Sequence, residues 1–251
     1  MHPLDGVQAL LFDVFGTVVD WHRSIVDELA AKAKGTVHEG EAWGDFANEW
    51  RAGYSRTTAR VAQGGEGPAS VDEMHRLLLD EMLSSPRWSH LDSLWDDAAR
   101  KDLVLGWHRL QGWEDSSAGL AALKERVIIG TLSNGNVRLL IDMAKSAQLP
   151  WDVVFSSQLF GSYKPNPKIY LGAVGLLDLP PQRVALVAAH ISDCAAAKAA
   201  GLKAVYVRRP TEDRNIPFSP EFIEQGKADA IADDFWGVVK LMDEADKHAE
   251  I

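Results

Sequence analysis

The chain has 251 residues, 46% hydrophobic and 25% charged, which is the composition of a globular protein long enough for a substantial core. Its net charge of −10 argues against nucleic-acid or membrane partners, and the single cysteine, Cys194, excludes an internal disulfide framework. No apolar run approaches the ~18 residues of a membrane span, and the N-terminus lacks a signal-peptide pattern, so we expect a cytoplasmic protein.

Five short apolar runs separated by helical patterns predict a parallel β-sheet. The runs are 7–12, 127–131, 151–155, 184–188 and 203–207, and the helical patterns are 116–126, 137–148, 167–177 and 193–200. Alternation at this pitch is typical of a sheet covered on both faces, so the sequence predicts an α/β fold with a Rossmann-like core. We expect an irregular surface loop over 208–222 and a closing helix over 233–247.

A long helical block interrupts the alternation after the first strand. Amphipathic stretches cover 41–61 and 71–83, and a breaker rich in glycine lies between them at 64–70. We therefore expect two domains, an α/β core formed by 1–20 and 112–251 and an inserted all-helical cap formed by 21–111. Because the predicted cap is rich in tryptophan and leucine, a homodimer remains an open alternative.

Polar clusters follow the predicted strands, where parallel sheets bind their ligands. They are Asp13, then Thr131 to Asn134, then Tyr163 to Pro165, and then His190 to Asp193. A lone carboxylate at a buried strand end is costly, so Asp13 is either a capped strand end or a group that a site uses.

The order of these clusters resembles the haloacid dehalogenase superfamily, and the resemblance covers nearly the whole chain, including the place of the helical block. Phosphatases of that superfamily carry Asp-x-Asp in the first cluster, but the second position here is Phe15, which cannot transfer a proton. Ala189 likewise replaces one of the paired acids that hold magnesium. Without the ion, a phosphate ~4 Å from Asp13 would cost about 4 kcal/mol per charge pair at an effective dielectric constant of ~20.

Three segments are similar to the L-2-haloacid dehalogenase branch, which uses no metal. They are "FDVFGTVVDW" at 12–21, "WR" at 50–51 and "KPNPKIY" at 164–170. The "AAH" at 188–190 is closer to the subgroup that acts on short haloacetates, including fluoroacetate. The resemblance implies an enzyme that hydrolyses carbon–halide bonds of small haloacids and releases halide, with no cofactor and no metal.

The resemblance also implies a role for each residue. Asp13 would attack carbon 2 and form an ester, Lys164 would keep Asp13 ionised, and Asp193 would pair with Lys164 and orient the hydrolytic water. Thr17, Ser133 and Asn134 would hold the substrate carboxylate and stabilise the tetrahedral intermediate.

Further residues would form the rest of the substrate site. Arg51 would accept the departing halide, His190 could add a donor, and Phe15 and Trp21 would supply apolar walls. The expected substrate-binding set is completed by Tyr170 and Leu132.

Each of these residues also has a structural interpretation. Lys164 could be an exposed loop lysine, Asp193 a helix N-cap, His190 a satisfied buried histidine and Tyr170 a core residue. Two other functions stay open, a phosphatase or phosphonate hydrolase on the same scaffold and a catalytically silent binding module.

Overall fold

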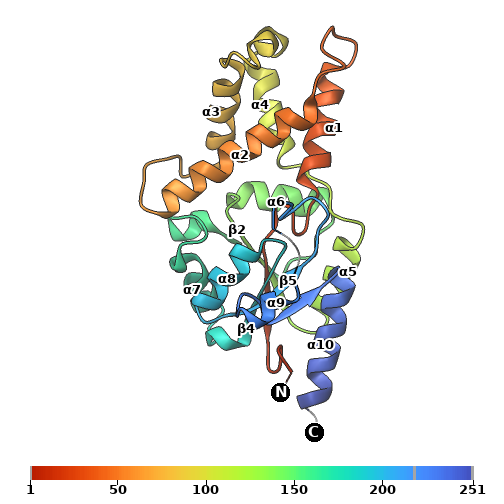
Figure 1. The fold of residues 1–251 in the computed structure, drawn as a ribbon, viewed down its shortest axis with the longest axis vertical. Helices are drawn as coiled ribbons and strands as arrows, with labels where there is room; N and C mark the ends of the chain where they lie inside the picture. Colours follow the sequence, from red (N-terminus) through yellow and green to blue (C-terminus); the bar gives the residue numbers. More distant parts are fainter. Residues whose placement is uncertain (1, 217–218, 250–251) are drawn as a thin grey trace.

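The sheet has six parallel strands in the order β3-β2-β1-β4-β5-β6 (Figure 1). A computed structural model describes residues 2–216 and 219–249. The strands are β1 (Ala9–Phe12), β2 (Ile128–Ser133), β3 (Val153–Ser156), β4 (Val184–Ala188), β5 (Lys203–Val207) and β6 (Ala230–Ala232). The predicted α/β fold is confirmed. The sequence missed β6, because three residues are too short to give an apolar run.

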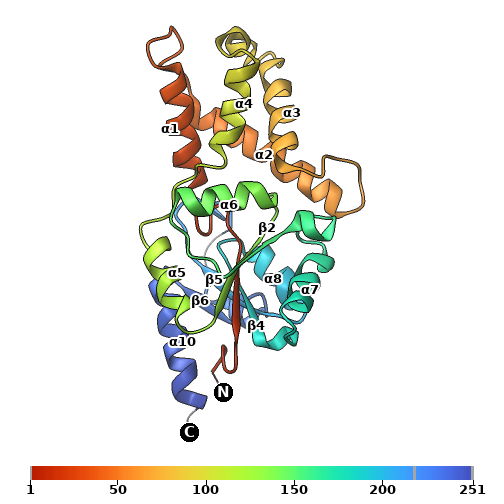
Figure 2. The ribbon, with the colours of Figure 1, turned by 180° about the vertical axis from the view of Figure 1, so that it is seen from behind.

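Two separate hydrophobic clusters lie on the two faces of the sheet. Side chains alternate along a strand, so Leu10 and Phe12 join one cluster while Ala9 and Leu11 join the other. The helices behind the strands are α5 (Ser116–Lys124), α6 (Val137–Ser146), α7 (Pro167–Leu176), α8 (Ile191–Ala199), α9 (Glu221–Glu224) and α10 (Phe235–Ala249). Helices α5, α6 and α10 pack in the first cluster and α7, α8 and α9 in the second (Figures 1 and 2).

The helices between β1 and α5 stand beyond the carboxyl ends of the strands (Figures 1 and 2). They are α1 (Trp21–Ala33), α2 (Trp43–Ala62), α3 (Val71–Leu83), η1 (Ser89–Leu94) and α4 (Asp97–Gly106), and we call them the cap helices. The Asp20 carboxylate caps α1 by accepting a hydrogen bond from the amide of Arg23. The boundaries expected for a separate cap domain, at 21 and 111, remain a prediction.

Hydrogen bonds hold the cap helices against the α/β part of the chain. Buried His108 lies between Asp72 of α3 and Asp142 of α6, with 3.0 Å to each carboxylate. The hydroxyl of Tyr163 donates to the carbonyl of Pro68, within the loop expected to be a breaker. These contacts fix α3 and the loop before it over the ends of the strands, where the polar clusters lie.

Two sequence-based expectations need correction. Helix α8 begins at Ile191, with His190 as its N-cap residue, so Asp193 lies in the first turn and is not the N-cap. The segment 208–222 is not a surface loop throughout, because the side chains of Arg209 and Glu212 are buried. Among the described residues, no helix has the length and apolar character needed to cross a bilayer.

Candidate active site

Asp13 lies directly beyond β1, where its amide donates to the carbonyl of Val187 in β4. Its side chain is buried, and both carboxylate oxygens have partners. The ammonium of Lys164 lies 2.8 Å from Oδ1, and the Thr17 hydroxyl donates to Oδ2 at 2.7 Å. The same hydroxyl accepts a hydrogen bond from the amide of Ala189. The carboxylate is therefore fixed in one orientation by groups from separate segments.

Lys164 bridges two carboxylates. Its Nζ atom lies 2.5 Å from Oδ2 of Asp193, and the Tyr170 hydroxyl donates to Oδ1 of Asp193, also at 2.5 Å. The expected pairing of Asp193 with Lys164 is thus present. Tyr170 combines the two roles considered for it in the sequence analysis. Its ring lies in the core, and its hydroxyl reaches the charged cluster.

Burial works against ionisation of this cluster, but the opposite charges outweigh it. Burial alone would raise the pKa of Asp13, yet Lys164 and His190 hold that pKa well below its usual range. Burial would likewise lower the pKa of Lys164, whereas Asp13 and Asp193 raise it. Asp13 is therefore a carboxylate and Lys164 an ammonium across the physiological pH range.

His190 connects Asp13 with Glu212, a residue that no sequence signal pointed to. Its Nδ1 lies 3.1 Å from Oδ2 of Asp13, and its Nε2 lies 2.8 Å from Oε2 of Glu212. Burial disfavours the imidazolium, but the hydrogen bonds to Asp13 and Glu212 raise the pKa of His190 to about 10. Burial also opposes ionisation of Glu212, but the hydrogen bond with His190 outweighs it and lowers the pKa of Glu212. His190 is therefore protonated at neutral pH.

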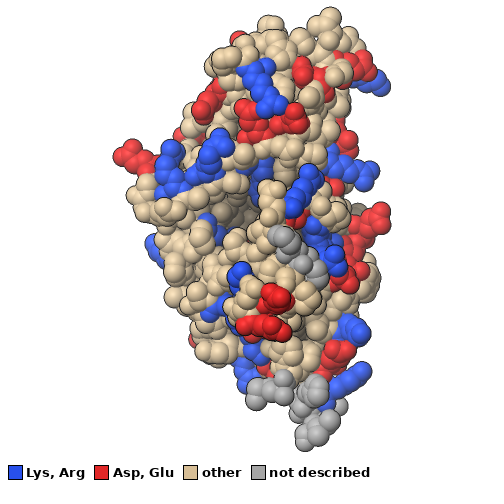
Figure 3. Space-filling model, in the orientation of Figure 1, with Lys and Arg blue, Asp and Glu red and all other residues tan. Residues whose placement is uncertain are grey.

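A cavity of about 270 Å³ opens in front of this cluster, at the level where Figure 3 shows the molecular surface hollowed beneath Lys and Arg side chains. The α/β part contributes Asp13, Phe15, Asn134, Lys164, Pro165, His190, Ser192 and Asp193, and α2 contributes Arg51, Tyr54, Ser55, Thr58 and Ala59. The volume suits a molecule of few non-hydrogen atoms.

Arg51 brings a positive charge to this cavity from the cap helices. Its guanidinium carbon lies 4.5 Å from the ring centroid of Tyr54, 5.2 Å from that of Phe15 and 5.5 Å from that of Trp21. Nη1 of Arg51 is buried and has no hydrogen-bond partner within the described residues. An aromatic enclosure with an unpaired donor can bind an anion.

The remaining predicted residues lie around the cavity or behind it. Asn134 lines the cavity, and its Oδ1 accepts from the Lys164 amide and from the Ser157 hydroxyl. Ser133 is buried and accepts from the amide of Gly135, and Leu132 is buried in the sheet. Direct substrate contact by these residues remains a prediction.

Tyr54 carried a signal that the sequence analysis missed. It lies three residues after Arg51, which places both side chains on one face of α2. Glu212 gave no such signal, because it lies in an irregular segment without periodicity. Only the folded chain brings it to His190.

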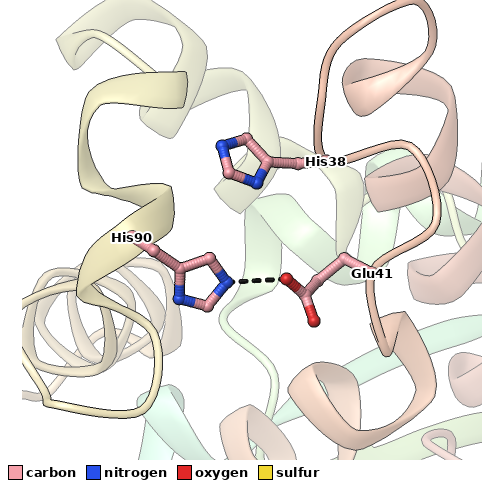
Figure 4. A group of neighbouring side chains, drawn as sticks. All are labelled: His38, Glu41 and His90. Carbon is pink, nitrogen blue, oxygen red and sulfur yellow. Dashed lines mark hydrogen bonds and ion pairs between the residues drawn. The ribbon is translucent and has the colours of Figure 1, made fainter.

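Three side chains at the tip of the cap helices could hold a metal ion, namely His38, Glu41 and His90 (Figure 4). Their donor atoms lie within 4.8 Å of one another, and Nε2 of His90 lies 2.6 Å from Oε2 of Glu41. His90 and Glu41 are therefore already hydrogen-bonded to each other. Near Asp13, the Lys164 ammonium occupies the position between the two carboxylates.

A larger cleft of about 970 Å³ lies between α1 and the segment after β5. Its three arginines are paired with acids of the same lining, for example Arg209 with Asp115 at 2.8 Å. It contains none of the groups around Asp13, so the smaller cavity is the candidate active site.

Comparison with known proteins identifies the family of the chain. Residues 7–201 match the family of haloacid dehalogenase-like hydrolases. The chain is 28% identical over 224 residues to (S)-2-haloacid dehalogenase 4A of Burkholderia cepacia, covering 86% of this chain and 90% of the relative.

Solved structures show the same similarity. The defluorinating L-2-haloacid dehalogenase Rha0230 is 38% identical with a TM-score of 0.82, covering 94% of this chain and 95% of that one. The L-2-haloacid dehalogenase PA0810 is 37% identical with the same TM-score, covering 95% of this chain and 100% of that one. The chain therefore belongs to the haloacid dehalogenase-like hydrolases, in the L-2-haloacid dehalogenase branch, whose members cleave carbon–halide bonds.

Proposed function

We propose that the protein hydrolyses the carbon–halide bond of short 2-haloacids, haloacetates included, through an ester on Asp13 and without a metal ion. One observation carries the proposal. An ionised carboxylate faces a small cavity whose opposite side holds the unpaired, buried guanidinium nitrogen of Arg51. The nucleophile and an anion acceptor thus lie on two sides of a space that fits a small acid.

In the first step, a carboxylate oxygen of Asp13 attacks carbon 2, and the halide leaves with the electron pair of the carbon–halide bond. Negative charge moves from Asp13 to the halide. Lys164 and Thr17 hold the attacking carboxylate in place, and Arg51 offers the departing halide a positive charge in an aromatic enclosure.

In the second step, water attacks the ester carbonyl, the hydroxy acid leaves and Asp13 returns as a carboxylate. The Lys164 ammonium is positioned to stabilise the negative oxygen of the tetrahedral intermediate.

The Lys164 ammonium also supports a reaction without a metal. It lies within hydrogen-bond distance of both Asp13 and Asp193, and it supplies the positive charge between the two carboxylates. A divalent ion at the same place would have to displace a buried ammonium that is already paired.

Fluoroacetate belongs among the proposed substrates. The relative Rha0230, described as a defluorinating enzyme, is 38% identical over 94% of this chain. Fluoride is a poor leaving group that gains most from hydrogen-bond donors, and the unpaired Nη1 of Arg51 is a cationic donor at the cavity.

The test is halide release from fluoro-, chloro- and bromoacetate and from both enantiomers of 2-chloropropionate, each with magnesium or with EDTA. We expect turnover of the haloacetates and of the L enantiomer. Each substrate should react at the same rate with magnesium as with EDTA. Magnesium-dependent phosphate release from a generic phosphate ester, with no halide from any haloacid, would instead establish the phosphatase alternative.

A further inference from the structure

We propose that His190 is the general base of ester hydrolysis and that Glu212 is the residue that positions it. This inference rests on the Asp13 ester of the proposed function. It assigns His190 a task beyond that of a donor in the halide pocket, and it gives a role to Glu212.

The geometry ties both ring nitrogens of His190 to carboxylates. Nδ1 faces Asp13 at 3.1 Å, and Nε2 faces Glu212 at 2.8 Å. Glu212 is itself fixed, because its Oε1 accepts from Nε1 of Trp21 at 2.8 Å and from the hydroxyl of Thr211 at 3.0 Å. The imidazole therefore has one orientation, with Nδ1 directed at the group that becomes the ester.

Charged groups from several neighbouring segments lie around His190. Asp13 and Glu212 contact the ring itself. The others are Lys164, which bridges Asp13 and Asp193, Asp213, which accepts from the Ile191 amide, and Arg51, which acts on Glu212. Of these charges, formation of the ester removes only that of Asp13.

Loss of that charge changes the protonation of His190. In the free site the imidazole lies between two carboxylates, and its pKa is about 10. An ester is neutral and accepts hydrogen bonds poorly, so its formation lowers the pKa of His190 toward the ordinary value of 6.5. His190 then releases its proton to solvent, and Nδ1 becomes free to accept a hydrogen bond from water.

The remaining steps balance. Neutral His190 takes a proton from the water that attacks the carbonyl carbon of the Asp13 ester, and the electron pair of that carbonyl moves onto its oxygen. The tetrahedral intermediate then expels the hydroxy acid, whose oxygen takes the second proton of the attacking water. This regenerates the Asp13 carboxylate beside the His190 imidazolium, with one proton released to solvent per turnover.

Asp193, the other candidate base, is less free to act. Its two oxygens already accept hydrogen bonds of 2.5 Å from Lys164 and Tyr170. Its geometry therefore suits a residue that holds Lys164 in place.

The decisive variant is His190→Gln, whose side-chain amide can still donate to Asp13 but cannot take a proton. Mixed rapidly with bromoacetate, it should release one halide per site at a near-normal rate and then stall, with turnover reduced ~10²-fold or more. Mass spectrometry of the quenched protein should find the adduct on the peptide containing Asp13. His90→Gln is the matched control, because His90 forms an equivalent pair with Glu41 at the cap tip, and it should behave as wild type.

The pH profile of ester hydrolysis in the variant Glu212→Gln tests the role of Glu212. Glu212→Gln keeps a partner for Trp21 but removes one negative charge beside His190, so the pKa of His190 falls. The rising limb of ester hydrolysis should move to lower pH, and the plateau should fall ~10-fold because the base is weaker. A loss of rate without movement of the limb would show a purely structural role and overturn the assignment of Glu212.

Two results would contradict the proposal in different ways. If His190→Gln loses the halide burst and accumulates no ester, then His190 acts before the ester forms and is not the base. A single turnover of wild type in heavy-oxygen water tests the proposed function itself, because the ester route labels Asp13. Label in the product instead would end the ester mechanism, whatever His190 does.

Discussion

The buried charges on the two sides of the cavity differ in whether they have partners. On the α/β side, Asp13 has a donor on each oxygen, and the cationic partner Lys164 is itself shared with Asp193. On the cap side, the Arg51 guanidinium lies among aromatic rings with a buried nitrogen that has no partner among residues 2–216 and 219–249. An unmade buried hydrogen bond costs roughly 1–3 kcal/mol, so the second arrangement is maintained at a cost.

This difference separates a preorganised site from an incomplete one. The strand ends already hold Asp13 as a carboxylate in one orientation, so the attack in the proposed mechanism would need no reorganisation of this side chain. The cap side is incomplete until an anion arrives. His75, buried behind Arg51, fits this view, because burial and then the nearby guanidinium hold its pKa well below the usual value. His75 is therefore neutral, and Arg51 supplies the positive charge on the cap side of the cavity.

The largest effect should come from the α/β side. Asp13→Asn keeps the size of the side chain but removes the nucleophile, so halide release should fall at least ~10⁴-fold. Circular dichroism and thermal melting should show a folded protein. Substantial activity in a variant whose mass confirms asparagine at position 13 would mean that another group attacks the substrate.

Removal of the shared cation should have the next largest effect. Lys164→Met leaves Asp13 and Asp193 close together without the ammonium between them, which raises the pKa of Asp13. We expect kcat to fall ~10²-fold to ~10³-fold and the acid limb of the pH profile to move upward. Lys168→Met, at an exposed lysine of α7, is the matched control, and an equal loss there would refute a specific role of Lys164.

On the cap side the effect should be smaller and should depend on the halide. Arg51→Ala should reduce kcat/KM about 10-fold to 100-fold, more for fluoroacetate than for bromoacetate, because fluoride gains most from a donor. Arg56→Ala, on an exposed part of the same helix, should leave all rates unchanged. Equal losses for all halides would show that Arg51 binds the substrate carboxylate rather than the leaving group.

The smallest effect concerns stability and pH. Because the pKa of His190 is about 10 in the folded chain and 6.5 in the unfolded reference, its stabilisation is complete below pH 6.5 and disappears as pH rises toward 10. The difference in unfolding free energy between wild type and His190→Gln should therefore shrink as pH rises over that range. Urea unfolding at several pH values measures it, and a constant difference would refute the charged pair.

Much of this fold could be predicted from local pattern. The runs 184–188 and 203–207 became strands at the predicted residues, since each is a continuous apolar segment between polar turns. The start of α8 was misplaced because its N-cap residue, His190, is not a preferred N-cap type, whereas Asp193 three residues later is. Arg51 was predicted to belong to the site, but the aromatic residues around its guanidinium come from the segment after β1, from α1 and from α2, and are separated in sequence.

The sequence by itself determined the order of strands and helices and the polar residues at each strand end, because hydrophobic periodicity and turn residues are local properties of the chain. The resemblance implied that Lys164 pairs with Asp13 and Asp193, but tertiary structure alone decided the distances of those pairs and placed His190 between Asp13 and Glu212. The physical reason is that a pairing of charges depends on distances of a few ångströms between residues that are far apart in the chain, and only the packed sheet and loops set those distances.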